Sequence, residues 1–229
     1  MTSRPRRLGA LGLLLTVPLL AACGSSDDEG GDDTSSGGGA DGACTYAEDS
    51  LGQVAGDVDL PAADPTVAGE VGVSMALADG ATIEMTLDAD AAPCTVNSFV
   101  SLAEQGYYDD TTCHRLTVPP ASIQVLQCGD PTATGAGGPG YTIPDELEQT
   151  SDYPAGTVAM AKRQDPDSGG SQFFLVYGDT LLPPEYTVFG TMDEASVAVV
   201  QAIADGGTDT GGPDGAPATP AEIATVTVG

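Results

Sequence analysis

Short runs of alternating apolar and polar residues, separated by turns rich in glycine and proline, dominate this chain. Ala78-Asp79-Gly80 joins the clearest pair, 71–77 and 83–87, which predicts a hairpin because strand side chains alternate between two faces. Six more strands are predicted at 112–118, 123–127, 157–161, 172–177, 188–190 and 223–228. Two stretches have helical spacing, one from Pro93 to before Gly106, with Thr95 as its expected N-cap, and one at 193–204. We therefore expect a mainly β protein, a closed eight-stranded antiparallel barrel capped by two helices.

The first 22 residues have the pattern of an export signal. Three arginines precede an apolar run over 8–20, which is too short to span a bilayer comfortably. The run ends at Leu20-Ala21-Ala22-Cys23, which resembles a bacterial lipobox and implies lipidation of Cys23 after cleavage. We expect a lipid anchor that holds the protein to the outer face of the cell membrane. An ordinary secretory signal with an incidental cysteine is the alternative.

Residues 23–65 are expected to form the lipidated cysteine and a flexible acidic tether. Within them, 24–43 consist almost throughout of Gly, Ser, Asp and Thr and contain no apolar side chain larger than Ala. Such a segment cannot bury enough apolar surface to offset the entropy of ordering it. The folded domain is expected to cover 66–229.

The charge balance restricts the partners. The chain has 34 acidic residues against six Lys and Arg, and removal of the three signal arginines leaves 3 − 34 = −31. So acidic a surface repels phosphate backbones, which argues against nucleic-acid binding. The remaining bases, Arg115, Lys162 and Arg163, fall in the segments richest in motifs.

Four cysteines remain if Cys23 carries lipid, and an even number in an exported chain predicts two disulfides. Three connectivities are open. We favour Cys113–Cys128 with Cys44–Cys94, because Cys113 and Cys128 flank a predicted strand pair. His114 is the sole histidine and no cysteines have metal-ligand spacing, so we expect neither a metal nor a cofactor.

Two segments concentrate polar and aromatic side chains. In the first, Cys113-His114-Arg115-Leu116 leads through a Pro-Pro turn to a strand ending Gln127-Cys128-Gly129-Asp130, which places a guanidinium and an amide on neighbouring strands. In the second, Met160-Ala161 leads through an irregular loop to Gly170-Ser171-Gln172-Phe173-Phe174.

These segments resemble the motifs of cyclophilins. The family's Phe-His-Arg and Gln-Gly-Gly-Asp correspond to 113–115 and 127–130, and its Gly-Thr-Gly-Gly corresponds to 135–138. Its Met-Ala, Gly-Ser-Gln-Phe-Phe and Val-Phe-Gly recur at 160–161, 170–174 and 188–190. The matches keep their order from about residue 71 to the carboxyl end. The chain therefore resembles a bacterial, actinobacterial-like lipoprotein form of cyclophilin, which implies a cyclophilin-like barrel.

The resemblance implies a peptidyl-prolyl cis/trans isomerase that acts on exported proteins. Twisting a prolyl bond breaks amide resonance, against a barrier of roughly 18–20 kcal/mol. A donor aimed at the twisted amide stabilises this state more than either planar one, without nucleophile or metal. Arginine suits this task because it stays charged and its donors form a fixed fork.

The resemblance also assigns the site, in a protein that we expect to be monomeric and to bind proline-containing peptides. The catalytic residues would be Arg115, Gln127 and Phe174. The substrate-binding residues would be His114, Gln124, Val125, Ala161, Gln172, Leu182 and Tyr186. We interpret His114 as a packed, hydrogen-bonded residue near the site, because twisting an amide needs no proton transfer.

Several positions depart from the family pattern. Gln124 stands where the family usually has an aromatic wall of the proline pocket, which Ile123 would supply after a shift of register. Lys162-Arg163 replaces the family's Asn-Ala, and Tyr186 replaces a common His. These departures motivate an alternative function, a non-catalytic module that holds proline-containing segments or a fixed partner.

Overall fold

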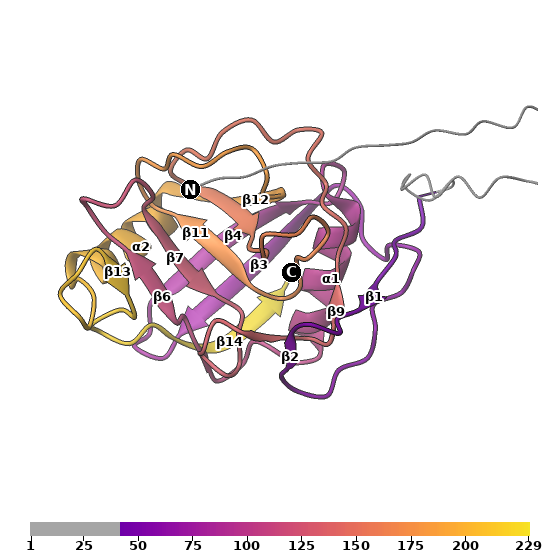
Figure 1. Ribbon diagram of the computed structural model, residues 1–229, viewed down its shortest axis with the longest axis horizontal. Helices are drawn as coiled ribbons and strands as arrows, with labels where there is room; N and C mark the ends of the chain where they lie inside the picture. The colour runs from indigo at the N-terminus through magenta and orange to yellow at the C-terminus, as the bar shows by residue number, and fades with distance from the viewer. Residues whose placement is uncertain (1–41) are drawn as a thin grey trace, which may run out of the picture. The chain divides into compact units, whose positions relative to one another are not determined.

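A computed structural model describes residues 42–229, so the predicted signal peptide, Cys23 and the first part of the predicted tether, up to residue 41, lie outside the described residues. Ten strands form one curled antiparallel sheet in the order β13-β6-β7-β11-β10-β12-β4-β3-β14-β5 (Figure 1). Their bounds are β3 Glu70–Leu77, β4 Thr82–Asp88, β5 Thr111–Thr112, β6 Arg115–Thr117, β7 Val125–Cys128, β10 Thr157–Met160, β11 Phe173–Val176, β12 Val188–Met192, β13 Asp214–Gly215 and β14 Glu222–Val228.

The mainly β fold with two helices is confirmed, but the closed eight-stranded barrel is wrong in detail. The predicted strand at 112–118 is divided into β5 and β6, because Cys113 N donates to Ala221 O whereas His114 N donates to Gln127 O. The chain thus changes partner from β14 to β7 at this point. Two residues of the chain separate β5, at one edge of the curled sheet, from β6, which is next to the other edge strand, β13. β13 is an additional strand that pairs with β6.

The hairpin of β3 and β4 shows the predicted alternation. Every second residue of both strands, beginning at Val71 and Ile83, is buried against the main core. Phe99, Tyr108, Phe173 and Phe189 pack together in that core with ring centroids 4.9–5.7 Å apart. Phe174 follows Phe173 and belongs to a separate apolar cluster, because successive side chains of a strand point to opposite faces.

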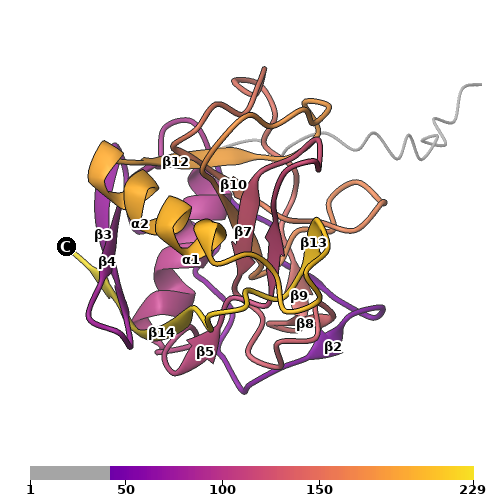
Figure 2. The same ribbon diagram turned by 90° about the vertical axis from the view of Figure 1, so that its left-hand side faces the viewer.

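The two helices cover the core side of the sheet. Helix α1 (Pro93–Glu104) packs against β14, and α2 (Glu194–Asp205) packs against β4 (Figure 2). Asp193 caps α2, where its side chain accepts from Ser196 N at 2.7 Å. Within the described residues, no helix has both the length and the apolar character needed to cross a membrane.

Helix α1 is capped from outside its own sequence. Thr95 was the expected cap, but the helix begins at Pro93 and the Glu146 carboxylate accepts from the amides of Cys94 and Thr95, both at 2.9 Å. Glu146 is therefore part of the helix cap and not a solvated surface charge. A carboxylate is favourable there because the first-turn amides have no partner within the helix.

Residues 44–60, here called the strap, are ordered against the domain, so the tether boundary predicted at residue 65 is wrong. Its β1 (Ala47–Glu48) pairs with β9 (Tyr141–Thr142), and its β2 (Gln53–Val54) pairs with β8 (Gly137–Gly138). Disulfides join Cys44 to Cys94 and Cys113 to Cys128, the connectivity favoured from the sequence.

Candidate active site

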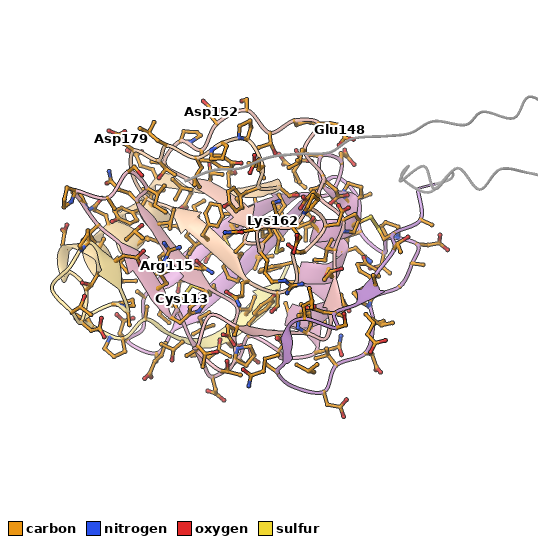
Figure 3. All side chains as sticks on the ribbon, viewed as in Figure 1. Cys113, Arg115, Glu148, Asp152, Lys162 and Asp179 are labelled. Atoms are coloured by element: carbon orange, nitrogen blue, oxygen red, sulfur yellow. A yellow bond between two sulfur atoms is a disulfide. The ribbon has the colours of Figure 1, made fainter. Side chains whose placement is uncertain are left out.

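A pocket of about 190 Å³ lies on the face of the sheet opposite the main core. The pairing register places Arg115 opposite Gln127, and Gln127 opposite Phe174, so these three residues form a row across β6, β7 and β11. The remaining lining residues come from neighbouring strands and loops: Ile123, Val125, Ala161, Lys162, Leu182 and Tyr186. Arg115 and Lys162 lie on the same face of the sheet in Figure 3.

The apolar part of the pocket is a small core of its own. Val125 and Phe174 are buried together with Tyr153, and Tyr186 packs edge-on against Phe174 with ring centroids 5.5 Å apart. The Tyr153 hydroxyl lies 3.1 Å from Tyr186 O and accepts from Tyr186 N at 2.9 Å, so it supports the loop that carries Leu182 and Tyr186. Sequence reasoning missed Tyr153, because no pattern links it to a loop some thirty residues later.

The family pattern puts one wall of the proline pocket at residue 124. In this structure Ile123 lines the pocket instead. The Gln124 side chain instead donates to Asp179 O at 3.2 Å, and its backbone amide donates to Thr180 Oγ1 at 2.9 Å. This contradicts the placement of Gln124 in the pocket. The reason is local: β7 begins at Val125, so residues 123 and 124 belong to the preceding loop and do not follow the strand alternation.

A row of polar contacts runs from the pocket to a glycine-rich loop. Arg115 Nη1 donates to Gln127 Oε1 at 3.3 Å, and Gln127 Nε2 donates to Gln172 Oε1 at 2.8 Å. Gln172 Nε2 in turn donates to the carbonyl oxygens of Gly135 and Gly137 at 3.0 and 2.9 Å. Each amide is therefore fixed in orientation, and Gln172 supports Gln127 without lining the apolar pocket.

Arg115 has a carboxylate partner that the sequence did not reveal. Asp214, on β13, accepts from Arg115 Nε at 2.9 Å and from Nη2 at 2.7 Å. The hydrogen bonds from Arg115 lower the pKa of Asp214, and those to Asp214 raise the pKa of Arg115. Asp214 lies almost a hundred residues away in a Gly/Pro/Thr/Asp loop, where one acidic residue looks like any other.

Asp130 organises the loop beside the site. Its carboxylate is fully buried and accepts from the amides of Thr132, Gly135 and Gly137 at 2.7–3.0 Å. Burial raises the pKa of this carboxyl, but the hydrogen bonds outweigh that effect and the net pKa is lowered. The carboxylate thus stays ionised and holds the loop that Gln172 contacts.

His114 lies outside the apolar pocket. Its two ring nitrogens are buried and have no hydrogen-bond partner among the described residues, and burial lowers its pKa. The ring lies under Gly135, where an added Cβ would approach it to 3.7 Å. This agrees with a packing role, and the hydrogen bonds that we expected for His114 are not present among residues 42–229.

A second cavity of about 360 Å³ adjoins the pocket and shares Gln127, Ala161 and Lys162 with it. Two ion pairs lie at its border. Lys162 Nζ is 3.3 Å from Asp145, and Arg163 forms two hydrogen bonds of 2.8 and 2.9 Å with Asp49 of the strap. Lys162 and Arg163 are therefore paired groups rather than free loop charges.

Fold and pocket together define a class of protein: a curled antiparallel sheet that presents a guanidinium and an amide beside an apolar pocket, with no Ser, Thr or Cys among the lining residues. A model of the cyclophilin-type peptidyl-prolyl cis-trans isomerase/CLD family matches residues 72–228. The chain belongs to the cyclophilin-type peptidyl-prolyl cis-trans isomerase family.

Individual relatives agree with this assignment. Probable peptidyl-prolyl cis-trans isomerase B of Mycobacterium tuberculosis is 47% identical over 174 residues, which are 71% of this chain and 56% of the relative. The Mycobacterium leprae protein is 48% identical over 171 residues, 69% of this chain and 57% of the relative. The chain thus spans little more than half the length of these relatives. A cyclophilin-type isomerase of Cryptosporidium parvum has a similar structure, with a TM-score of 0.60, 26% identity, and coverage of 70% of this chain and 98% of that one.

Proposed function

We propose that this protein accelerates cis/trans isomerisation of X-Pro bonds in exported proteins, and that Arg115 stabilises the twisted bond. The observation that carries this proposal is the row of Arg115, Gln127 and Phe174 across three paired strands. That row places a fixed cation directly beside an apolar pocket of a size that suits a proline ring.

The chemistry needs a donor and a seat for the ring. Uncatalysed isomerisation takes tens to hundreds of seconds because amide resonance must be broken. Phe174, Val125 and Leu182 hold the ring, while Ala161 and Tyr186 contact the adjoining peptide. An N–H group of Arg115 then meets the twisted amide, and Gln127 keeps the guanidinium in place. Such preorganised donors stabilise a transition state without any reorganisation at the moment of reaction.

Export and anchoring belong to the same proposal. The signal-like residues 1–22 and the lipobox-like Cys23 support a location on the outer face of the membrane, where the domain would act as a monomer and meet unfolded exported chains. Two disulfides support this location, because disulfides persist in oxidising compartments outside the cytoplasm.

The test measures isomerisation of a prolyl peptide by NMR exchange spectroscopy, with the full chain and its Arg115→Ala variant. Loss of the donor should lower kcat/KM about 100-fold, the usual effect of removing one preorganised hydrogen-bond donor. Circular dichroism should show the same fold for both proteins. If wild type and Arg115→Ala are equally slow, the enzyme proposal fails, and peptide binding without turnover would identify a proline-binding module.

A further inference from the structure

We infer that Asp214 is a positioning residue, which sets the plane of the Arg115 guanidinium and so aims its free N–H groups at the twisted bond. This inference rests on the role proposed for Arg115. Asp214 lies on β13, which occupies only Asp214–Gly215 between α2 and β14. This loop lies outside every motif used to recognise the family.

Three hydrogen bonds hold the plane of the Arg115 guanidinium in one orientation. Two parallel hydrogen bonds join Nε and Nη2 to the two oxygens of Asp214, at 2.9 and 2.7 Å. A third hydrogen bond runs from Nη1 to Gln127. Arginine has five N–H donors, so 5 − 3 = 2 N–H groups have no partner within residues 42–229. One belongs to Nη1 and one to Nη2. Because the guanidinium is planar, fixing one edge also fixes the direction of these two.

The loop that carries Asp214 is itself braced. Asp214 is in register with Thr117 of β6, and Val118 N donates to Pro213 O at 2.9 Å. Across the loop, Asp209 N donates to Ala216 O at 2.8 Å and its carboxylate accepts from Ala216 N. Buried Thr208 also donates to Gly212 O at 2.7 Å. The carboxylate is therefore presented from a rigid support, as positioning requires.

Stability is a weak reason for this ion pair. The side chains of Arg115 and Asp214 are 38% and 50% exposed, and pairs so open to water contribute little to folding. Asp214 also offsets part of the positive charge that the reaction uses. Orientation is the remaining benefit, since a free arginine side chain would distribute its donors over many rotamers. Loss of Asp214 should therefore affect turnover more than folding.

The experiment compares Asp214→Asn and Asp214→Ala with wild type in the full chain, using NMR exchange on a prolyl peptide. We expect kcat to fall about tenfold with KM nearly unchanged, because misplacement of a catalytic group reduces rate more than binding. Asp214→Glu should recover part of the loss, since it keeps a carboxylate. Glu104→Gln, at the exposed end of α1, removes one negative charge elsewhere and should keep wild-type kcat.

A spectroscopic readout ties the effect to Arg115. The described residues contain two arginines, Arg115 and Arg163, so their side-chain Nε–H signals can be assigned with single variants. Asp214→Asn should shift and broaden the Arg115 signal and leave that of Arg163 in place. Thermal unfolding midpoints should stay within a few degrees of wild type.

The outcomes separate this inference from the proposed function. If Arg115→Ala abolishes turnover while Asp214→Asn keeps wild-type kcat, Asp214 does not position Arg115, and the proposed function stands. A fall in kcat with an unmoved Arg115 signal would also overturn the inference, since the effect would not pass through Arg115. If Arg115→Ala leaves turnover unchanged, the proposed role of Arg115 is wrong, and the inference about Asp214 is wrong with it.

Discussion

At the scale of single residues, removal of the Tyr153 hydroxyl tests how far the pocket depends on the hydrogen bonds that hold the loop of Leu182 and Tyr186. Tyr153→Phe leaves the amide of Tyr186 without its acceptor and should cost about 1–3 kcal/mol of stability, the usual penalty for an unsatisfied buried polar group. Because the loop that carries Leu182 and Tyr186 loosens, we expect KM for a prolyl peptide to rise several-fold with kcat less affected. Tyr46→Phe is the control, since Tyr46 donates to Cys94 O at the strap. An unchanged KM in Tyr153→Phe would show that the loop holds its shape without the hydroxyl.

Single residues also show where sequence reasoning succeeds. Arg115, Gln127, Val125 and Phe174 were predicted from the resemblance to cyclophilin motifs, and strand pairing places them on neighbouring strands of the sheet. Gln124 was misplaced because the alternation stops one residue before β7. Asp214 was not predictable because its contact depends on how the curled sheet brings β13 beside β6.

At the scale of elements, the strap depends on its disulfide. Cys44–Cys94 closes a loop of 50 residues, for which the chain-entropy model gives a stabilisation of about 4 kcal/mol, against about 3 kcal/mol for the 15-residue loop of Cys113–Cys128. We expect Cys44→Ala/Cys94→Ala to lower the free energy of unfolding by several kcal/mol and to speed amide hydrogen exchange at 44–58. In the matched variant Cys113→Ala/Cys128→Ala, stability should fall while exchange in the strap changes little in native conditions. Equal protection of the strap in both variants would show that its strand pairs and the Asp49–Arg163 pair suffice.

Most elements were predicted because their patterns are local, as in the hairpin of β3 and β4 and in helix α2 behind its Asp193 cap. The strap was taken for tether because a Gly- and Asp-rich segment precedes it, although Tyr46, Leu51 and Val54 interrupt that composition. Its order comes from partners far along the chain, which alternation within the segment does not indicate. The change of strand partner between β5 and β6 likewise depends on strands elsewhere in the chain, and the local pattern does not indicate it.

At the scale of the whole molecule, charge predicts that stability depends on salt as well as on pH. Residues 42–229 contain 34 − 6 = 28 acidic groups and three basic ones, and each basic group is paired with one carboxylate, so 28 − 3 = 25 carboxylates lack such a partner there. Their mutual repulsion destabilises the compact state at neutral pH. Salt screens this repulsion, so the free energy of unfolding at pH 7 should rise when the salt concentration is increased to 1 M, where the screening length is about 3 Å.

Acidification should lower stability. The folded-state pKa values of Asp49, Asp130 and Asp214 lie below their ordinary value of 3.8, so the stability that these groups contribute is present above that value and is lost as the pH falls through the folded pKa values. Urea midpoints measured from pH 7 to pH 2 should therefore fall once the pH drops below that ordinary value. At pH 7, the midpoint should rise with added salt, because salt screens the repulsion between unpaired carboxylates. A midpoint that does not rise with salt at pH 7 would show that self-repulsion is unimportant in this chain, and a midpoint that stays constant down to pH 2 would show that Asp49, Asp130 and Asp214 do not stabilise the fold.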